Sequence, residues 1–200
     1  MAEAETFRRL LIGGALVVVP LMLYHRIRAH AGGEPLDRRQ EGLFILATLR
    51  PVALVFWAGT IAFMVRPASM AWSTVALHAP GRWTGVALFA LGTALLAWAL
   101  HGLGPNLTDT VVTRRAHTLV TTGAYRWVRH PFYDAMALIV IGSALLAANW
   151  FLLVTACLVV ALVVYRTRIE EARLLARFGG PYAAYLSRTG RFLPRFGVTR

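Results

Sequence analysis

The sequence predicts an all-α integral membrane protein, a helical bundle with about five transmembrane helices. Apolar residues make up 58% of its 200 residues, and the mean hydropathy is +0.58, above the composition typical of soluble domains. The apolar residues gather in runs of roughly 17 to 25, the length that crosses ~30 Å of hydrocarbon. The net charge of +12 comes from arginines that flank these runs. It therefore indicates lipid headgroups and membrane orientation, and not nucleic acid.

Each apolar run is interpreted as one membrane span. No small-residue cleavage site follows the first run, so we expect a retained helix and not a signal peptide. The last two runs are joined only by Ala148, Asn149 and Trp150. One continuous helix there would overshoot the bilayer by about 20 Å, so a tight helical hairpin is predicted. The expected spans lie near residues 8 to 25, 42 to 65, 83 to 103, 132 to 148 and 150 to 166.

The spans divide the chain into two parts. Residues 1–82 hold the first two spans and an interfacial segment that carries aromatic anchors such as Trp72. Residues 83–200 hold the other three spans, a loop at 104–131 and a tail at 167–200. The second part contains the polar motifs described below, so we expect any site to lie there.

Arginine positions predict the orientation. Five spans place the loops at 26 to 41 and 104 to 131 on the same side as the tail. That side carries sixteen arginines, eight of them from Arg166 onward, while the other side carries four. Because positive residues favour the cytoplasmic side, we expect a bacterial inner-membrane protein with its N-terminus outside and its C-terminus in the cytoplasm.

A polar segment precedes the fourth predicted span, where residues 117–133 read HTLVTTGAYRWVRHPFY. Pro131 suits the first turn of a helix, and the free amides of that turn form a natural anion site. Arg129 and His130 would then bind a carboxylate or phosphate, with Tyr133 one turn inward. The other interpretation is that the cations contact headgroups and the tyrosines form an interfacial belt.

The tail supplies two neighbouring carboxylates, Glu170 and Glu171, at the exit of the fifth predicted span. Unpaired charge is costly there unless a partner or ligand meets it. Arg166 shares a helix face with Glu170. The two form either part of a site or an intrahelical ion pair worth only ~0.3 to 0.5 kcal/mol. The tail helix is expected to end at Gly179-Gly180 and to restart at Pro181.

Arg50, followed by Pro51, lies about a third of the way into the second predicted span. It either snorkels toward the cytoplasmic surface or contacts a substrate headgroup near a proline kink. No metal site is predicted, because no two histidines stand at ligand spacing on one helix. The one cysteine, Cys157, lies inside an apolar run and is expected to be a buried hydrophobic residue.

Several motifs follow one another between about residues 100 and 195. They are His117-Thr118-Leu119-Val120, Gly123-x-Tyr125, Arg129-His130-Pro131-x-Tyr133, Arg166-x3-Glu170-Glu171-x2-Leu174, Phe178-Gly179, Tyr182-x2-Tyr185 and Arg191-Phe192-Leu193-Pro194. Their order and spacing resemble the isoprenylcysteine carboxyl methyltransferase family and, more broadly, the membrane phospholipid methyltransferases. The resemblance covers about half of the chain.

The resemblance implies an S-adenosylmethionine-dependent methyltransferase that acts on a lipid-like or prenylated substrate from the bilayer, most directly by carboxyl O-methylation of an isoprenylcysteine-like group. Arg166 and Glu170 would be the catalytic residues, and Arg166 would face the substrate. Arg50 lies outside the resemblance and is a substrate-binding candidate only because of its position in the second span. The alternatives are a phospholipid amine N-methyltransferase, a thiol S-methyltransferase, or a non-catalytic membrane binding or assembly protein. The implied cofactor site comprises His117, Thr118, Leu119, Val120, Tyr125, Arg129, His130, Pro131, Phe132, Tyr133, Glu170 and Glu171.

The chemistry of these residues agrees with that cofactor. S-adenosylmethionine carries a carboxylate, an ammonium and a sulfonium. His130 with the helix start would meet the carboxylate, Glu170 the ammonium, and Tyr125 or Tyr133 the sulfonium. A carboxylate acceptor is already ionised at neutral pH, whereas an amine must lose a proton to a base. Arg166 therefore favours a carboxylate acceptor.

Two positions depart from the family pattern. Thr110 stands where relatives can have a glutamine that contacts the cofactor. Ala135 stands where relatives usually carry glycine, two residues after the motif tyrosine. The extra methyl group of Ala135 either narrows the site or repacks the helix that carries it.

Overall fold

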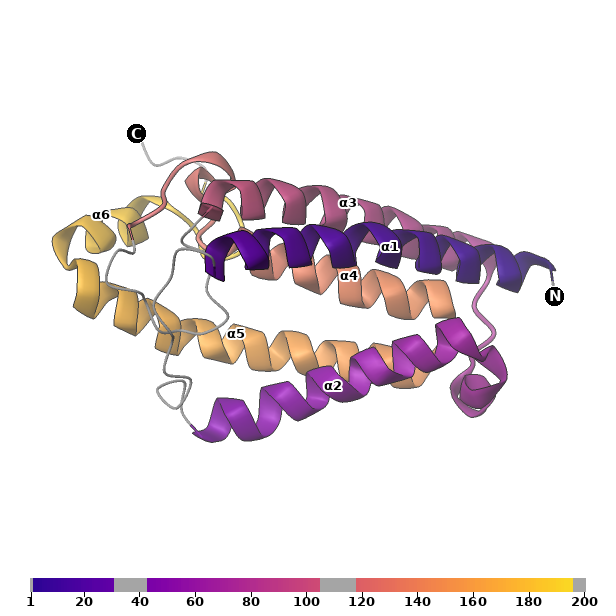
Figure 1. The fold of residues 1–200 in the computed structure, drawn as a ribbon. Helices are drawn as coiled ribbons and strands as arrows, with labels where there is room; N and C mark the ends of the chain where they lie inside the picture. Colours follow the sequence, from indigo (N-terminus) through magenta and orange to yellow (C-terminus); the bar gives the residue numbers. More distant parts are fainter. Residues whose placement is uncertain (1, 31–42, 105–117, 196–200) are drawn as a thin grey trace.

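Helices make up the described fold, so the predicted all-α class is confirmed. The computed structural model describes residues 2–30, 43–104 and 118–195, and these ranges contain no β-strand. Figure 1 shows the long helices side by side, with the N-terminus at one end of the bundle and α6 with the C-terminus at the other. The elements are α1 (Ala2–His30), α2 (Leu43–Val65), η2 (Pro67–Ser73), α3 (Ala79–Leu103), η4 (Gly123–Arg126), α4 (Pro131–Ala147), α5 (Trp150–Phe178) and α6 (Gly180–Arg188).

The predicted spans correspond to α1 to α5. In the described ranges, 4 helices are long and apolar enough to cross a membrane, namely α1, α2, α3 and α5. The remaining apolar helix, α4, has 17 residues and is largely buried between its neighbours α3 and α5. A short helix in that position has its backbone covered by protein, so it need not match the bilayer thickness by itself.

The fifth span and the predicted tail helix are one continuous helix. α5 has 29 residues, which gives a length of about 43 Å and exceeds the ~30 Å hydrocarbon core. No proline or glycine interrupts α5 before Phe178, which explains the continuity. Gly179 ends the helix with φ +55°, a value that favours glycine, and α6 restarts with a proline in its first turn. The predicted end and restart are therefore confirmed.

The α3 and α4 helices pack closely because glycines face the contact. A Cβ added at Gly85 would lie 2.8 Å from the backbone nitrogen of Leu146. A Cβ added at Gly142 would lie 2.8 Å from the backbone oxygen of Gly85 and from the backbone nitrogen of Phe89. Small residues permit this close backbone approach in membrane bundles. The α3–α4 pair therefore forms the tightest part of the scaffold that carries the polar motif at the α4 start.

The Gly142→Ala substitution is expected to destabilise the bundle, because the added methyl group would overlap backbone atoms that cannot rotate away. Overpacking of this kind costs about 1–3 kcal/mol. Thermal unfolding in detergent, followed by circular dichroism, would measure the loss. Gly13→Ala on α1 is the matched control, since nothing lies within 4 Å of its added Cβ. Equal melting temperatures for the two variants would contradict this account of the α3–α4 contact.

The α4–α5 connection is the tight hairpin that the sequence predicts. Ala148 adopts a left-handed conformation with φ 48°, and the Asn149 side chain caps α5 by accepting a 3.0 Å hydrogen bond from the Leu152 amide. The same side chain donates to Ser73 Oγ at 2.7 Å and to the Met70 carbonyl at 3.3 Å. Asn149 therefore fixes the turn and also ties it to η2.

Two arginines cap helix ends at the same end of the bundle as the hairpin. Arg82 is 9% exposed and donates to the Leu146 carbonyl near the end of α4, from Nε at 3.1 Å and Nη2 at 2.7 Å. Its guanidinium also lies 4.4 Å from the ring centroid of Phe7. Arg8 donates from Nε to the Met64 carbonyl of α2 at 2.8 Å. Both arginines satisfy carbonyls that an α-helix leaves without partners.

Candidate functional site

The site begins where the chain enters α4. Gly123 has φ +62° and starts η4, and the residue Tyr125 in that short helix is buried. Pro131 occupies the first turn of α4, as predicted. Burial raises the pKa of the Tyr125 phenol well above its ordinary value, with a smaller contribution from the negative charge of Glu170. This tyrosine is therefore a neutral hydrogen-bonding and packing group at physiological pH.

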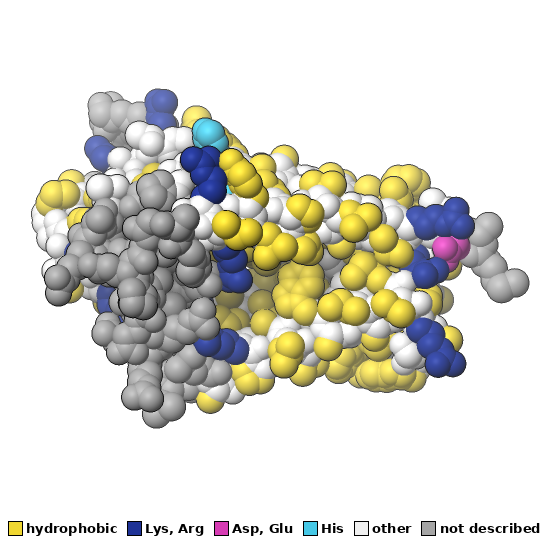
Figure 2. All heavy atoms as spheres, viewed as in Figure 1, with side chains coloured by type: hydrophobic (Ala, Val, Ile, Leu, Met, Phe, Trp, Pro, Cys, Tyr) yellow, Lys and Arg dark blue, Asp and Glu magenta, His cyan; other side chains and the backbone are white. Residues whose placement is uncertain are grey.

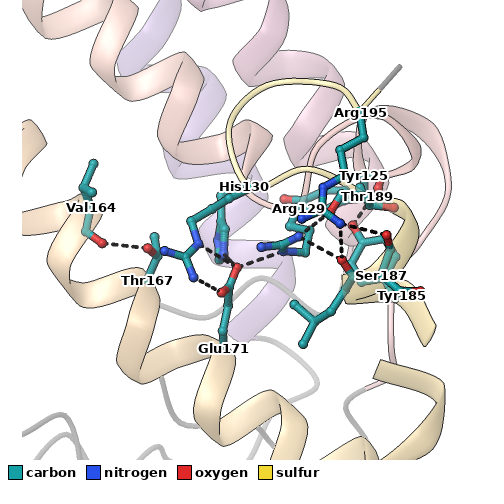
Figure 3. Close-up of polar contacts among 12 residues, drawn as sticks. Tyr125, Arg129, His130, Val164, Thr167, Glu171, Tyr185, Ser187, Thr189 and Arg195 are labelled. Atoms are coloured by element: carbon teal, nitrogen blue, oxygen red, sulfur yellow. Dashed lines mark hydrogen bonds and ion pairs between the residues drawn. The ribbon is translucent and has the colours of Figure 1, made fainter. Parts of the chain in front are cut away.

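Glu171 of α5 gathers three side chains from distant parts of the sequence. Its Oε1 accepts hydrogen bonds from Arg129 Nε at 2.9 Å and from Arg191 Nε at 3.1 Å, and lies 3.1 Å from His130 Nε2. Its Oε2 pairs with Arg191 Nη2. The side chains of Arg129, His130 and Glu171 are 8%, 5% and 9% exposed. Figure 3 shows Arg129 and His130 pointing toward this carboxylate. Charge-assisted hydrogen bonds of this kind offset the cost of burying the ions.

Glu170 makes a different contact on the neighbouring position of α5. Its Oε2 accepts a 2.7 Å hydrogen bond from the Tyr133 hydroxyl. The Tyr133 ring is nearly parallel to the His130 ring, with centroids 5.5 Å apart and an interplanar angle of 17°. The predicted approach of the α4 start to the carboxylates of α5 is therefore present. The two glutamates contact different partners at this junction.

The C-terminal segment closes over the start of α4. The Arg129 amide donates to the Gly190 carbonyl at 2.8 Å, and the His130 amide donates to the Arg191 carbonyl at 3.1 Å. We call residues 189–195, which follow α6, the C-terminal strap. Arg129 Nη1 also donates to the Thr189 carbonyl. The strap is therefore attached through both backbone and side-chain hydrogen bonds.

The two buried tyrosines of α6, Tyr182 and Tyr185, attach this helix to the same region. The Tyr185 hydroxyl donates to the Tyr125 carbonyl at 2.6 Å, and the Tyr182 and Tyr185 rings lie 6.0 Å apart. Burial is the largest cause that raises the pKa of both phenols well above the ordinary value. Their motif spacing thus places two neutral aromatic groups on the face of α6 that packs inward.

The remaining residues of the predicted cofactor site differ in how far they are buried. Thr118 is exposed, Leu119 and Val120 are half-buried, and Phe132 packs against the hydrophobic core. His117 and Thr110 lie outside the described residues.

Arg166 lies on α5 one turn before Glu170. It is half-buried, its Nε atom is shielded from solvent, and its charge acts on the Tyr133 hydroxyl. Arg50 is exposed on α2, which packs against α5. Its two interpretations, snorkelling and substrate contact, both remain.

The structure decides the position of Ala135, which the sequence left open. It also corrects the expected position of Cys157. Ala135 is 0% exposed in the hydrophobic core, and its carbonyl lies 2.9 Å from a Cβ added at Gly92 of α3. Its methyl group therefore belongs to the α3–α4 packing. Cys157 is exposed on α5, so the expectation of a buried position was wrong. The reason is that α5 turns this face outward, where an apolar residue can meet lipid.

Sequence reasoning quoted Arg191 as part of a motif but gave it no role, whereas the structure places its guanidinium on Glu171. Arg191 stands between Arg188 and Arg195, so nothing local in the sequence singled it out. Within the described ranges, no three His, Cys, Asp or Glu side chains are grouped so that they could hold a metal ion.

Known proteins are similar to the part of the chain that contains this site. The sequence profile of the isoprenylcysteine carboxyl methyltransferase (ICMT) family matches residues 85–176. The protein-S-isoprenylcysteine O-methyltransferase of Saccharomyces cerevisiae is 34% identical over 113 residues, which cover 55% of this chain and 47% of that protein. The human protein of the same name is 33% identical over 114 residues, which cover 56% and 40%.

A bacterial relative also matches. The cobalt-zinc-cadmium resistance protein CzcN of Cupriavidus metallidurans is 32% identical over 123 residues, which cover 60% of this chain and 55% of that protein. The chain thus spans about half, or less, of the length of these relatives.

A solved structure has the same fold. The structure of the eukaryotic intramembrane Ras methyltransferase isoprenylcysteine carboxyl methyltransferase matches with a TM-score of 0.53 and 22% identity, over 90% of this chain and 67% of that one. This likeness shows the arrangement of the helices. The sequence match to the isoprenylcysteine carboxyl methyltransferase family at residues 85–176 runs from α3 to the last turns of α5, and so includes the start of α4 and both glutamates of α5.

Proposed function

We propose that this protein is an S-adenosylmethionine-dependent methyltransferase that methylates a carboxylate on a lipid-borne, isoprenylcysteine-like substrate. The observation that carries the proposal is the junction between the α4 start and α5. There Glu170 accepts a hydrogen bond from the Tyr133 hydroxyl. This pair lies beside the buried cluster of Arg129, His130 and Glu171. The names of the yeast and human relatives support the isoprenylcysteine acceptor.

The residues at the junction fit the chemistry of the cofactor. Glu170 offers a carboxylate for an ammonium group, and His130 with the first-turn amides of α4 offers donors for a carboxylate. Tyr125 and Tyr133 offer aromatic surface for a sulfonium. When bound, the cofactor supplies an electrophilic methyl group. Thr118, Leu119, Val120, Pro131 and Phe132 complete the proposed lining, while Arg129 and Glu171 support it from the buried cluster.

The proposed acceptor is a carboxylate held by Arg166. A guanidinium binds a carboxylate in a bidentate fork and leaves a lone pair free for attack, and an ionised carboxylate needs no general base. The role of the protein is then to align the acceptor and to exclude water. Arg166 lies on the same helix as Glu170, one turn earlier, so acceptor and donor sites would be adjacent.

The surface of the bundle suits a lipophilic substrate. Figure 2 shows hydrophobic side chains over the face formed by α1 and α2, with a recess between these helices and basic side chains toward the ends of the bundle. A lipid chain entering sideways from the bilayer would pack against this face through van der Waals contacts and exchange one apolar environment for another. Arginine positions favour a cytoplasmic location for the junction, in contact with the soluble cofactor pool.

Titration calorimetry on the detergent-solubilised protein is the direct test. We expect S-adenosylmethionine and S-adenosylhomocysteine to bind with one site per chain. Radiolabelled S-adenosylmethionine with a small prenylcysteine, phosphatidylethanolamine or a thiol then separates the acceptors, and methylation of the prenylcysteine is expected. No detectable binding of either nucleoside would overturn the enzyme proposal, while methylation of the amine or the thiol alone would overturn the carboxylate assignment.

A further inference from the structure

Both carboxylate oxygens of Glu171 are already hydrogen-bonded within the protein. Donors from Arg129 and His130 reach Oε1, and Arg191 donates to both oxygens. Three of these four contacts fall on Oε1 and one on Oε2, so both oxygens are engaged and the Arg191 guanidinium spans the carboxylate. The side chain is also 9% exposed. Glu171 is therefore poorly suited to bind the ammonium group of a ligand directly.

Glu170 differs from its neighbour in both respects. Glu170 is half-buried, and its Oε2 accepts a 2.7 Å hydrogen bond from the Tyr133 hydroxyl. Consecutive residues on a helix point about 100° apart, so the two carboxylates leave α5 in different directions. Glu170 is the more accessible carboxylate at the junction.

A chain of contacts connects the two glutamates. Glu171 lies against His130 Nε2, and the His130 ring stacks on the Tyr133 ring at 5.5 Å and 17°. Tyr133 in turn donates to Glu170. Phe192 of the C-terminal strap also contacts the His130 ring, with centroids 5.9 Å apart. The orientation of His130 thus depends on Glu171, and the orientation of the Tyr133–Glu170 pair depends on His130.

We propose that Glu171 is a positioning residue of the cofactor site, which acts by orienting His130 and, through the stacked Tyr133, the ligand carboxylate Glu170. This inference rests on the proposed function. It gives the adjacent glutamates separate roles, with Glu170 in contact with the cofactor and Glu171 holding the groups around it. Glu171 also holds Arg129 at the α4 start and Arg191 of the strap. Its loss should therefore loosen the whole site and weaken binding of both the nucleoside and the amino-acid parts of the cofactor, whereas loss of Glu170 should weaken binding of the amino-acid part only.

The test compares two ligands on the full-length protein in detergent. S-adenosylhomocysteine carries the amino-acid group, and 5′-methylthioadenosine lacks it. Glu170→Gln is expected to weaken the first ligand only. Glu171→Gln is expected to weaken both by a similar factor of about tenfold, the lower end of the range seen when residues that orient metal-binding side chains are removed. Glu171→Asp keeps the charge in the cluster and should fall between the wild type and Glu171→Gln.

Hydrogen exchange supplies a second measurement that does not depend on binding. The Arg129 and His130 amides donate to the strap carbonyls of Gly190 and Arg191. Their exchange should accelerate in Glu171→Gln and remain as in the wild type in Glu170→Gln. Glu171→Asp serves the same purpose if the glutamine variant does not fold.

Each outcome decides the proposal. If Glu171→Gln weakens only S-adenosylhomocysteine, as Glu170→Gln does, Glu171 contacts the amino-acid group itself and the positioning role is overturned. Unchanged affinity for both ligands in Glu171→Gln and Glu171→Asp also overturns it. If the wild type binds neither ligand, the proposed function fails instead, which is a distinguishable result.

Discussion

The Arg166→Ala variant is expected to bind S-adenosylmethionine like the wild type but to transfer its methyl group at least about 100-fold more slowly, a loss of ~2.7 kcal/mol in transition-state stabilisation. Arg166 would hold the acceptor carboxylate in line with the methyl group. Without the guanidinium, the acceptor loses both its charge partner and its alignment. Single-turnover methyl transfer to a small prenylcysteine, with cofactor affinity measured in parallel, separates the two effects.

Arg168→Ala is the matched control for this variant. Arg168 lies two residues later on α5 and is exposed, so its removal should change neither cofactor affinity nor methyl transfer by more than about twofold. If Arg166→Ala loses cofactor affinity as strongly as Glu170→Gln, the separate substrate and cofactor roles of these two residues are wrong. Full transfer activity in Arg166→Ala would remove Arg166 from the acceptor site.

Glu170→Gln is expected to weaken S-adenosylmethionine binding by about 1.5–3 kcal/mol, or roughly 10- to 150-fold. Glutamine keeps the shape of the side chain and can still accept the 2.7 Å hydrogen bond from Tyr133. The change therefore removes mainly the negative charge that would pair with the ammonium group. Titration calorimetry in detergent measures the affinity directly.

The control for Glu170→Gln uses a carboxylate at the opposite end of the bundle. Glu5 pairs with Arg8 and Arg9 at the start of α1, and Glu5→Gln should leave cofactor affinity unchanged. Wild-type affinity in Glu170→Gln would show that the ammonium group is bound elsewhere. His130→Ala is expected to weaken binding as well, because it removes both a donor at the α4 start and the ring that stacks on Tyr133.

Local signals in the sequence predicted the helical elements well. Pro131 marked the start of α4, Gly179 marked the end of α5, and the short connection at Ala148 and Asn149 marked the hairpin. Each signal depends on backbone geometry within a few residues. The approach of the α4 start to the carboxylates of α5 also followed, because a hairpin returns the second helix to the level where the first one began.

The partners of individual charges could not be predicted in the same way. The spacing of four residues on α5 placed Arg166 and Glu170 on one helix face. The contacts of Glu171 instead come from His130, Arg129 and Arg191, which lie 41, 42 and 20 positions away in the sequence. Such pairs depend on how α6 and the C-terminal strap fold back, which no local pattern encodes. Arg8 and Arg82 were similarly counted as flanking charges, although both cap helix ends within the bundle.

The unbroken course of α5 has a consequence for how the candidate site can change. Glu170 lies 21 residues after the capping residue Asn149 on one continuous helix, a distance of about 32 Å. Inserting or deleting one residue between them would turn Glu170 by about 100° around the helix axis and shift it by about 1.5 Å. The direction in which this carboxylate points is therefore set at the hairpin, on the far side of the bundle. Length changes within α5 before Glu171 should therefore abolish the junction.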